Sequence, residues 1–187
     1  MVLKPQDLLV LLKIIAKQGD PWSYNGLAVE LGMSPAEVHA GIKRAIRARL
    51  ALKSDRGAPA RPVLRALEEF ILHGMPYVFI AEQEGMTRGI ATAWAAPMMS
   101  NQFIVGTEPP PVWPHPEGKT RGQGVSPLYK SAPFAAMQDV MLYELLALVD
   151  MLRIGRAREK ELAVKHLKPR LEEYRQNANA QDQRNDA

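Results

Sequence analysis

The chain has 187 residues, of which 47% are hydrophobic and 24% charged, with a net charge of +4 and no cysteine. This is the size and composition of one globular domain with a small appendage, and the lack of cysteine excludes disulfides, thiolate zinc sites and cysteine nucleophiles. No segment approaches the roughly 18 apolar residues of a membrane span, and the N-terminus has no signal-peptide pattern, so we expect a cytoplasmic protein with no membrane partner.

The positive charge is concentrated at the start of the chain. Residues 1–64 hold ten lysines and arginines against five acidic residues, whereas the rest of the chain is close to balance. A local excess of cations indicates an anionic partner, and nucleic acid is the first candidate. A solvated basic surface would give the same balance, so charge alone leaves both interpretations open.

Three helices are predicted before residue 50. Apolar residues in 5–17 repeat with the i, i+3, i+4, i+7 period of an amphipathic helix. A short second helix follows, with Ser23 as its N-cap and Gly32 supplying the positive φ at its end. Ser34-Pro35-Ala36-Glu37 then opens a third helix, because it combines an N-cap, a proline in the first turn and a capping-box glutamate. This helix runs to about Arg49.

The third helix is predicted to have a buried and an outward face. Val38, Ile42, Ala45 and Ile46 form its apolar stripe. Gly41 falls on the same stripe, where it would let another helix approach closely, although a mid-helix glycine costs about 1 kcal/mol relative to alanine. The residues expected to face outward are His39, Ala40, Lys43, Arg44 and Arg47.

Short elements follow the third helix. A short strand is predicted over 50–53. Residues 61–64 form either its partner strand or the start of the next helix. That helix is predicted over 63–73 and ends at Gly74. Residues 77–82 and 87–95 are expected to form two strands of a hairpin, because Glu84-Gly85 between them is typical of a tight turn.

The second half of the chain changes in character. Residues 97–133 hold eight of the fifteen prolines and show no helical period, which predicts an extended arm or a linker. Residues 139–154 predict a helix that is apolar nearly all round, and such a helix is buried in a core or in an oligomer interface. A charged helix over 156–167, broken or kinked by Pro169, and a disordered tail from Asn177 complete the prediction.

The fold class that follows is mainly α with small β (α+β). Helix, short helix, tight turn, capped basic helix and a hairpin-like return are the order of a winged helix-turn-helix. The predicted organisation is a winged helix-turn-helix domain (1–75), a β-hairpin with a proline-rich arm (76–135), a helical dimerisation or partner segment (136–176) and a disordered tail (177–187). Whether the 97–135 arm packs on its own chain, across a dimer or on a partner protein stays open.

Through Leu27-Ala28, Leu31-Gly32-Met33-Ser34, Val38 and Ile42, the chain resembles the MarR-like winged helix-turn-helix transcriptional regulators over about residues 5–75. The resemblance implies that the third helix reads DNA, that a β-wing touches the DNA backbone and that the protein acts as a dimer. The wing is short and contains proline, which departs from the family. The C-terminal half also departs from it and looks like that of uncharacterised bacterial regulators, some of which accompany toxin–antitoxin-type genes.

Eight residues are candidate DNA contacts. Those on the third helix are Ser34, His39, Lys43, Arg44 and Arg47. Those on the wing are Lys53, Arg56 and Arg61. For the cations and His39 the alternative is a solvated surface, and Ser34 caps its helix whatever the function. Replacing Arg44 and Arg47 together is expected to abolish specific DNA binding and leave stability nearly unchanged.

We expect no catalytic, metal or cofactor site. Gly118-Lys119-Thr120 is not a phosphate-binding loop, because Trp113 stands where that motif needs its first glycine. The four histidines are dispersed, and no two have metal-ligand spacing. Arg121–Gly124 is interpreted as a turn. Four aromatic residues are expected to be core and arm anchors, with a ligand pocket as the alternative: Tyr77, Trp94, Phe103 and Trp113.

The predicted function is therefore that of a homodimeric transcriptional regulator, a repressor, which binds specific sequences of double-stranded DNA through a recognition helix at 34–49. It is not expected to be an enzyme. The alternative is an antitoxin-like protein-binding module. In that case residues 77–175 would hold a toxin-like partner protein, and DNA binding would be autoregulatory. The proline-rich arm favours the alternative, because an extended segment can cover a large surface.

Overall fold

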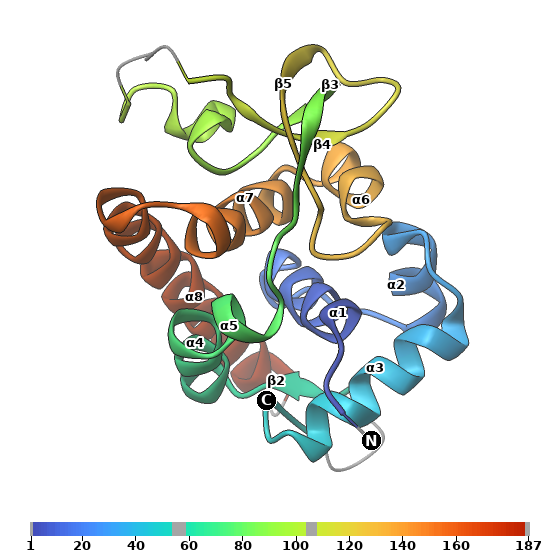
Figure 1. The fold of residues 1–187 in the computed structure, drawn as a ribbon. Helices are drawn as coiled ribbons and strands as arrows, with labels where there is room; N and C mark the ends of the chain where they lie inside the picture. The colour runs from blue at the N-terminus through green and yellow to red at the C-terminus, as the bar shows by residue number, and fades with distance from the viewer. Residues whose placement is uncertain (1, 54–58, 104–107, 186–187) are drawn as a thin grey trace.

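A computed structural model describes residues 2–53, 59–103 and 108–185 of the chain (Figure 1). Most of these residues are helical, and the strands form two small sheets. The predicted class, mainly α with small β, is confirmed. No helix of the described part is long and apolar enough to cross a membrane.

The first part of the chain has the predicted helix-turn-helix order. Gly32 ends the second helix with φ +60°, and Ser34 caps the third through a capping box with Glu37. The two strands that follow pair antiparallel, with Leu52 opposite Arg61. The elements are α1 (Pro5–Ala16), α2 (Tyr24–Leu31), α3 (Pro35–Arg47), β1 (Ala51–Leu52), β2 (Arg61–Pro62) and α4 (Leu64–His73). We call β1 and β2 the wing.

The hairpin expected over 77–95 is wrong. Residues 75–78 form a helical turn, and one strand runs straight through Glu84-Gly85 with only a register shift between Gln83 and Met86. Pairing with distant strands on both edges outweighs the local turn signal of Glu84-Gly85. The elements are α5 (Met75–Val78), β3 (Gln83–Ala91), the short 3₁₀ helices η1 (Ala93–Ala95) and η2 (Pro97–Met99), β4 (Pro111–Pro114) and β5 (Thr120–Val125).

The proline-rich region supplies two strands of a small closed sheet. β3 pairs antiparallel with both β4 and β5, and β4 pairs parallel with β5. The strands approach so closely that a Cβ on Gly122 would overlap the carbonyl oxygen of Pro110. Residues 121–124 are therefore part of a strand, and the expectation of a turn there is wrong.

Buried hydrogen bonds fasten this sheet to its own chain. The indole Nε1 of Trp113 on β4 donates to Asp150 Oδ2 at 2.6 Å, and Thr92 Oγ1 donates to the same oxygen at 2.8 Å. Arg153 balances the carboxylate charge at 2.7 Å. Burial of the Asp150 carboxyl raises its pKa, and this attraction opposes the shift. The described residues of the arm thus pack on the chain that carries them.

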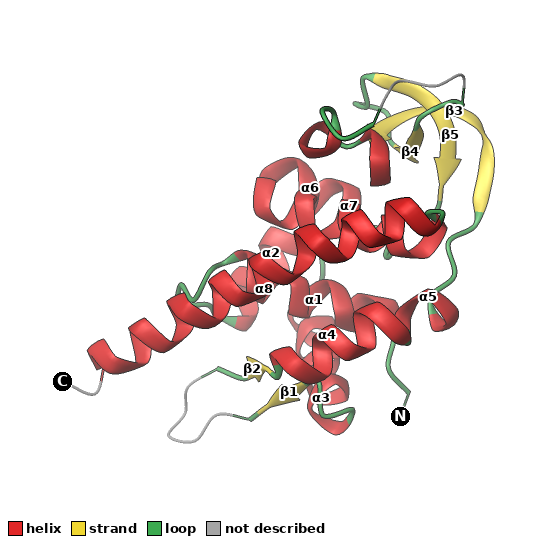
Figure 2. Ribbon diagram, turned by 90° about the vertical axis from the view of Figure 1, so that its left-hand side faces the viewer, coloured by secondary structure: helices red, strands yellow, loops and turns green. Residues whose placement is uncertain are grey.

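Three helices complete the fold: α6 (Ala132–Gln138), α7 (Val140–Ile154) and α8 (Ala157–Asn185). Asp139 caps α7, and Gly155 ends it. Helix α8 passes through Pro169 without a break, so the predicted break is wrong, and the helix continues beyond residue 177, where a disordered tail was expected. Leu167 and Leu171, on either side of the proline, are both buried, and this packing holds the helix together. Figure 2 shows α8 running from the region of β3–β5 to beyond the wing.

The core is centred on α1 and α7. Residues 8–12 of α1 are inaccessible to solvent, and residues 145–149 of α7 are almost completely so. One apolar cluster extends from α1 to α8 and includes Trp113 of β4. Because one chain already buries the apolar surface of α7, that helix has little left to offer a second copy. Of the two alternatives for this helix, the structure shows burial in the core of its own chain.

Candidate nucleic-acid interface

One face of α3 is open to solvent along its whole length. Ala36, His39, Lys43 and Arg47 follow each other at helical spacing, and all four are exposed. The opposite face packs on α1 and α2 through Val38, Ile42 and Ala45, as the apolar period predicted. We call the four exposed residues the α3 stripe.

The N-terminus of α3 is held by its own side chains. Ser34 Oγ accepts from the backbone N–H of Glu37 at 3.2 Å, and Glu37 Oε2 accepts from the backbone N–H of Ser34 at 2.8 Å. The backbone N–H of Ser34, and after it the Ser34 hydroxyl at 2.8 Å, donate to this carboxylate and lower the pKa of Glu37. The predicted cap is confirmed, and Ser34 remains exposed at the end of the α3 stripe.

His39 is supported by an aromatic neighbour that the sequence did not indicate. Its ring stacks on Tyr24 of α2, with centroids 3.6 Å apart and planes 7° apart. Tyr24 in turn meets Trp22 edge-on at 5.3 Å. His39 is exposed, and the stacking on Tyr24 restricts the orientation of its ring.

Lys43 and Arg47 stand out because no carboxylate pairs with them within the described part of the chain. Other cations of α1–α3 are engaged; Lys13, for example, contacts both Glu30 at 2.7 Å and Asp139 at 2.6 Å, and Lys17 contacts Glu30 at 3.2 Å. Cations that are left exposed and unneutralised on one helix face make that face attractive to anions. Arg49, which was not among the predicted DNA contacts, lies two residues after the end of α3 with φ +61° and is also exposed.

Arg44 does not belong to this surface, which corrects the prediction for it. Only 9% of the residue is exposed. Its Nε and Nη2 donate to the two carboxylate oxygens of Asp7 at 2.7 and 2.6 Å, and this bond raises the pKa of Arg44. Gly41 makes room for the pair, since a Cβ there would lie 3.2 Å from Asp7 Oδ1. The glycine thus permits the close helix approach that the sequence predicted, while Arg44 faces α1.

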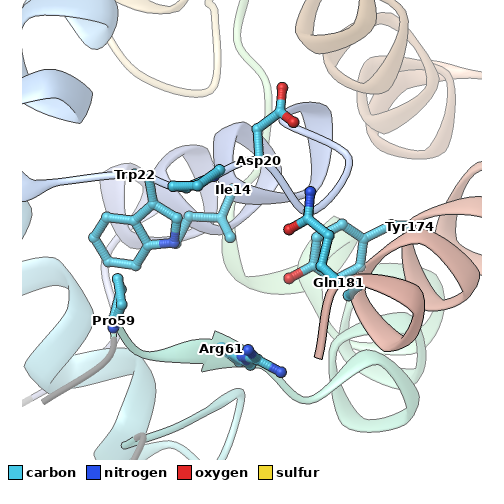
Figure 3. Close-up of a pocket in the computed structure, with 10 residues that line it drawn as sticks. Ile14, Asp20, Trp22, Pro59, Arg61, Tyr174 and Gln181 are labelled. Carbon is cyan, nitrogen blue, oxygen red and sulfur yellow. The ribbon is translucent and has the colours of Figure 1, made fainter. Parts of the chain in front are cut away.

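The wing candidates are only partly placed. Lys53 follows β1 and is exposed, and Arg56 lies outside the described residues. Arg61 lines a groove of about 170 Å³ between the α1–α2 loop, the wing and α8. Figure 3 shows Arg61 on β2 in this groove, which Trp22 and Tyr174 also line. Arg61 is exposed and lies on β2, opposite Leu52 of β1.

Other predicted features are dispersed. Trp113 is buried, Trp94 pairs with Phe103 at 6.4 Å between centroids, and Tyr77 is 80% exposed. Tyr77 is therefore not a core anchor. Gly118-Lys119-Thr120 connects two strands, and no helix follows it as a phosphate-binding loop would need. Within the residues that the structure places, no group of three or more His, Asp or Glu side chains could hold a metal ion.

Comparisons with known proteins give no match to this chain among protein-family models, curated proteins or solved structures.

Proposed function

We propose that this protein is a transcriptional regulator that binds double-stranded DNA through α3. The observation that carries the proposal is the α3 stripe on the second helix of a helix-turn-helix. Its Lys43 and Arg47 are exposed, and no carboxylate among the described residues pairs with them. A helix of this kind fits the major groove, and its N-terminal half meets the base edges. The capping box leaves that end well ordered.

The stripe and the wing support different kinds of contact. Lys43 and Arg47 suit phosphate oxygens or guanine, whereas Lys53 follows β1 and suits the flanking backbone. The MarR-like resemblance of residues 5–75 supports the same assignment and adds a homodimer that acts as a repressor. A twofold protein requires an inverted-repeat operator with half-sites about one helical turn apart. The dimer would use a surface other than α7.

The first test is a mobility shift on the promoter fragment upstream of the protein's own gene, at two salt concentrations and with competitor DNA. We expect a specific complex that weakens steeply with salt, because phosphate contacts release counterions. Lys43→Ala with Arg47→Ala should lower affinity at least tenfold. The matched control is Lys160→Ala with Lys165→Ala, which removes two exposed cations from α8 and should bind like the unmodified protein. Equal binding by both double variants would refute the proposal.

A second candidate function, a module that binds a protein partner, is favoured by exposed apolar side chains on α5 and in the loop after it. Tyr77, Val78 and Ile80 are 80%, 60% and 71% exposed. Neighbouring apolar side chains in contact with water are typical of an interaction surface. This surface belongs to the 77–175 segment that would hold a toxin-like partner, with DNA binding then autoregulatory.

The partner hypothesis is tested by co-expressing the chain with the product of the neighbouring gene and measuring complex formation by size-exclusion chromatography. Tyr77→Ser with Ile80→Ser should dissociate the complex and leave DNA binding intact, because both side chains are on α5 and the loop after it, outside the helix-turn-helix. A complex that survives these changes would argue against this surface.

A further inference from the structure

A segment from the second half of the chain packs against the turn between α2 and α3. Gly32, at the centre of that turn, has φ +60°, and a Cβ on it would lie 3.0 Å from the ring of Phe134. Ser131 is the next neighbour of the same position. Helix α6 packs against α2 beside this contact. The start of α3 is therefore bordered by residues that come about a hundred positions later in the sequence.

Tyr129 links this segment directly to the cap of α3. Its hydroxyl donates to Glu37 Oε1 at 2.9 Å, while Glu37 Oε2 is engaged with Ser34. Both oxygens of the carboxylate are thus held in place. Partial burial, together with this hydrogen bond, raises the pKa of Tyr129, so the phenol remains a donor at neutral pH.

Lys130 places a cation next to this carboxylate. The side chain is exposed, and its Nζ lies 5.8 Å from the centre of the Tyr129 ring. Its charge contributes to the lowered pKa of Glu37, after the hydrogen bonds from Ser34 and Tyr129. No carboxylate forms an ion pair with Lys130 in the part of the chain that the structure covers.

The position of Lys130 near Glu37 reduces an electrostatic repulsion in the proposed interface. The N-terminal end of a recognition helix comes close to DNA, where the Glu37 carboxylate would repel phosphates. A lysine beside it offsets that repulsion and offers a phosphate contact of its own. We propose that Tyr129 and Lys130 complete the DNA interface, with Lys130 binding a phosphate next to the start of α3 and Tyr129 acting as a positioning residue. The inference rests on the proposed function.

Lys130→Ala tests the phosphate contact in a salt titration of DNA binding. Removing one lysine–phosphate contact should weaken binding about three- to tenfold at low salt and reduce the salt slope by about one. Lys160→Ala on α8 is the matched control and should change neither. If Lys130→Ala leaves affinity and slope as they are, the phosphate contact is refuted.

Glu37→Gln distinguishes a direct contact from a purely compensating charge. It removes the charge, while the amide keeps one oxygen that accepts from Ser34 and an NH2 group that can donate to the Tyr129 hydroxyl. If Lys130 binds phosphate, Lys130→Ala should reduce the salt slope equally in the Glu37→Gln background. If Lys130 only neutralises Glu37, its effect should disappear in that background, which would overturn the assignment.

Tyr129→Phe tests the positioning role by removing only the hydroxyl. Binding to the specific fragment should weaken several-fold, while binding to competitor DNA and the salt slope stay constant, because no charge is lost. Equal losses on both DNAs would indicate a merely structural role and refute positioning. Failure of the proposed function is separately visible, since Lys43→Ala with Arg47→Ala would then also have no effect.

Discussion

Arg44 and Asp7 form a buried pair that connects α3 to α1. Asp7 is completely inaccessible to solvent, and two hydrogen bonds join it to the guanidinium. A paired charge can be tolerated in such a place, whereas an unpaired one carries a large desolvation cost. Arg44 is therefore a structural residue, and Arg47 is the arginine of α3 that is exposed for contact with a ligand.

We predict that Arg44→Ala destabilises the protein by about 3–5 kcal/mol, because it leaves the Asp7 carboxylate buried without a partner. Urea denaturation followed by circular dichroism measures the change. Arg47→Ala should stay within about 0.5 kcal/mol of the unmodified protein, as is usual for an exposed residue. Adding Asp7→Asn to Arg44→Ala should recover part of the loss. Similar stabilities for the two single variants would show that the ion pair is unimportant.

At the scale of elements, the sequence predicted those features whose interacting residues lie a few positions apart. The α3 start was predictable because Ser34 and Glu37 are three residues apart and satisfy each other. The path of β3 through Glu84-Gly85 was not, since its partners lie in β4 and β5. The same reason explains Arg44, whose partner is 37 residues away. Tyr129, 92 residues from Glu37, had no sequence signal at all.

At the scale of the whole molecule, the helix-turn-helix shares one core with the rest of the chain. Helix α1 packs against α3 on one side and α7 on another. Lys13 adds a polar link, because it contacts Glu30 of α2 and the α7 cap Asp139 at 2.7 and 2.6 Å. These contacts raise the pKa of Lys13 against the opposing effect of its burial, so the junction stays charged at neutral pH.

Because the core is shared, we predict that residues 1–75 do not fold independently, although the sequence pattern predicts a domain over this range. Without α7 and α8, the fragment would expose several α1 side chains from the run 8–12 to water, and each fully buried leucine contributes about 1.5–3 kcal/mol. The fragment should therefore show no cooperative thermal transition by circular dichroism, whereas the full chain shows one. A fragment that melts cooperatively and binds the promoter DNA would establish an autonomous domain instead. In that case the hydrogen bond of Tyr129 to α3 and the nearby charge of Lys130 would not be needed for binding.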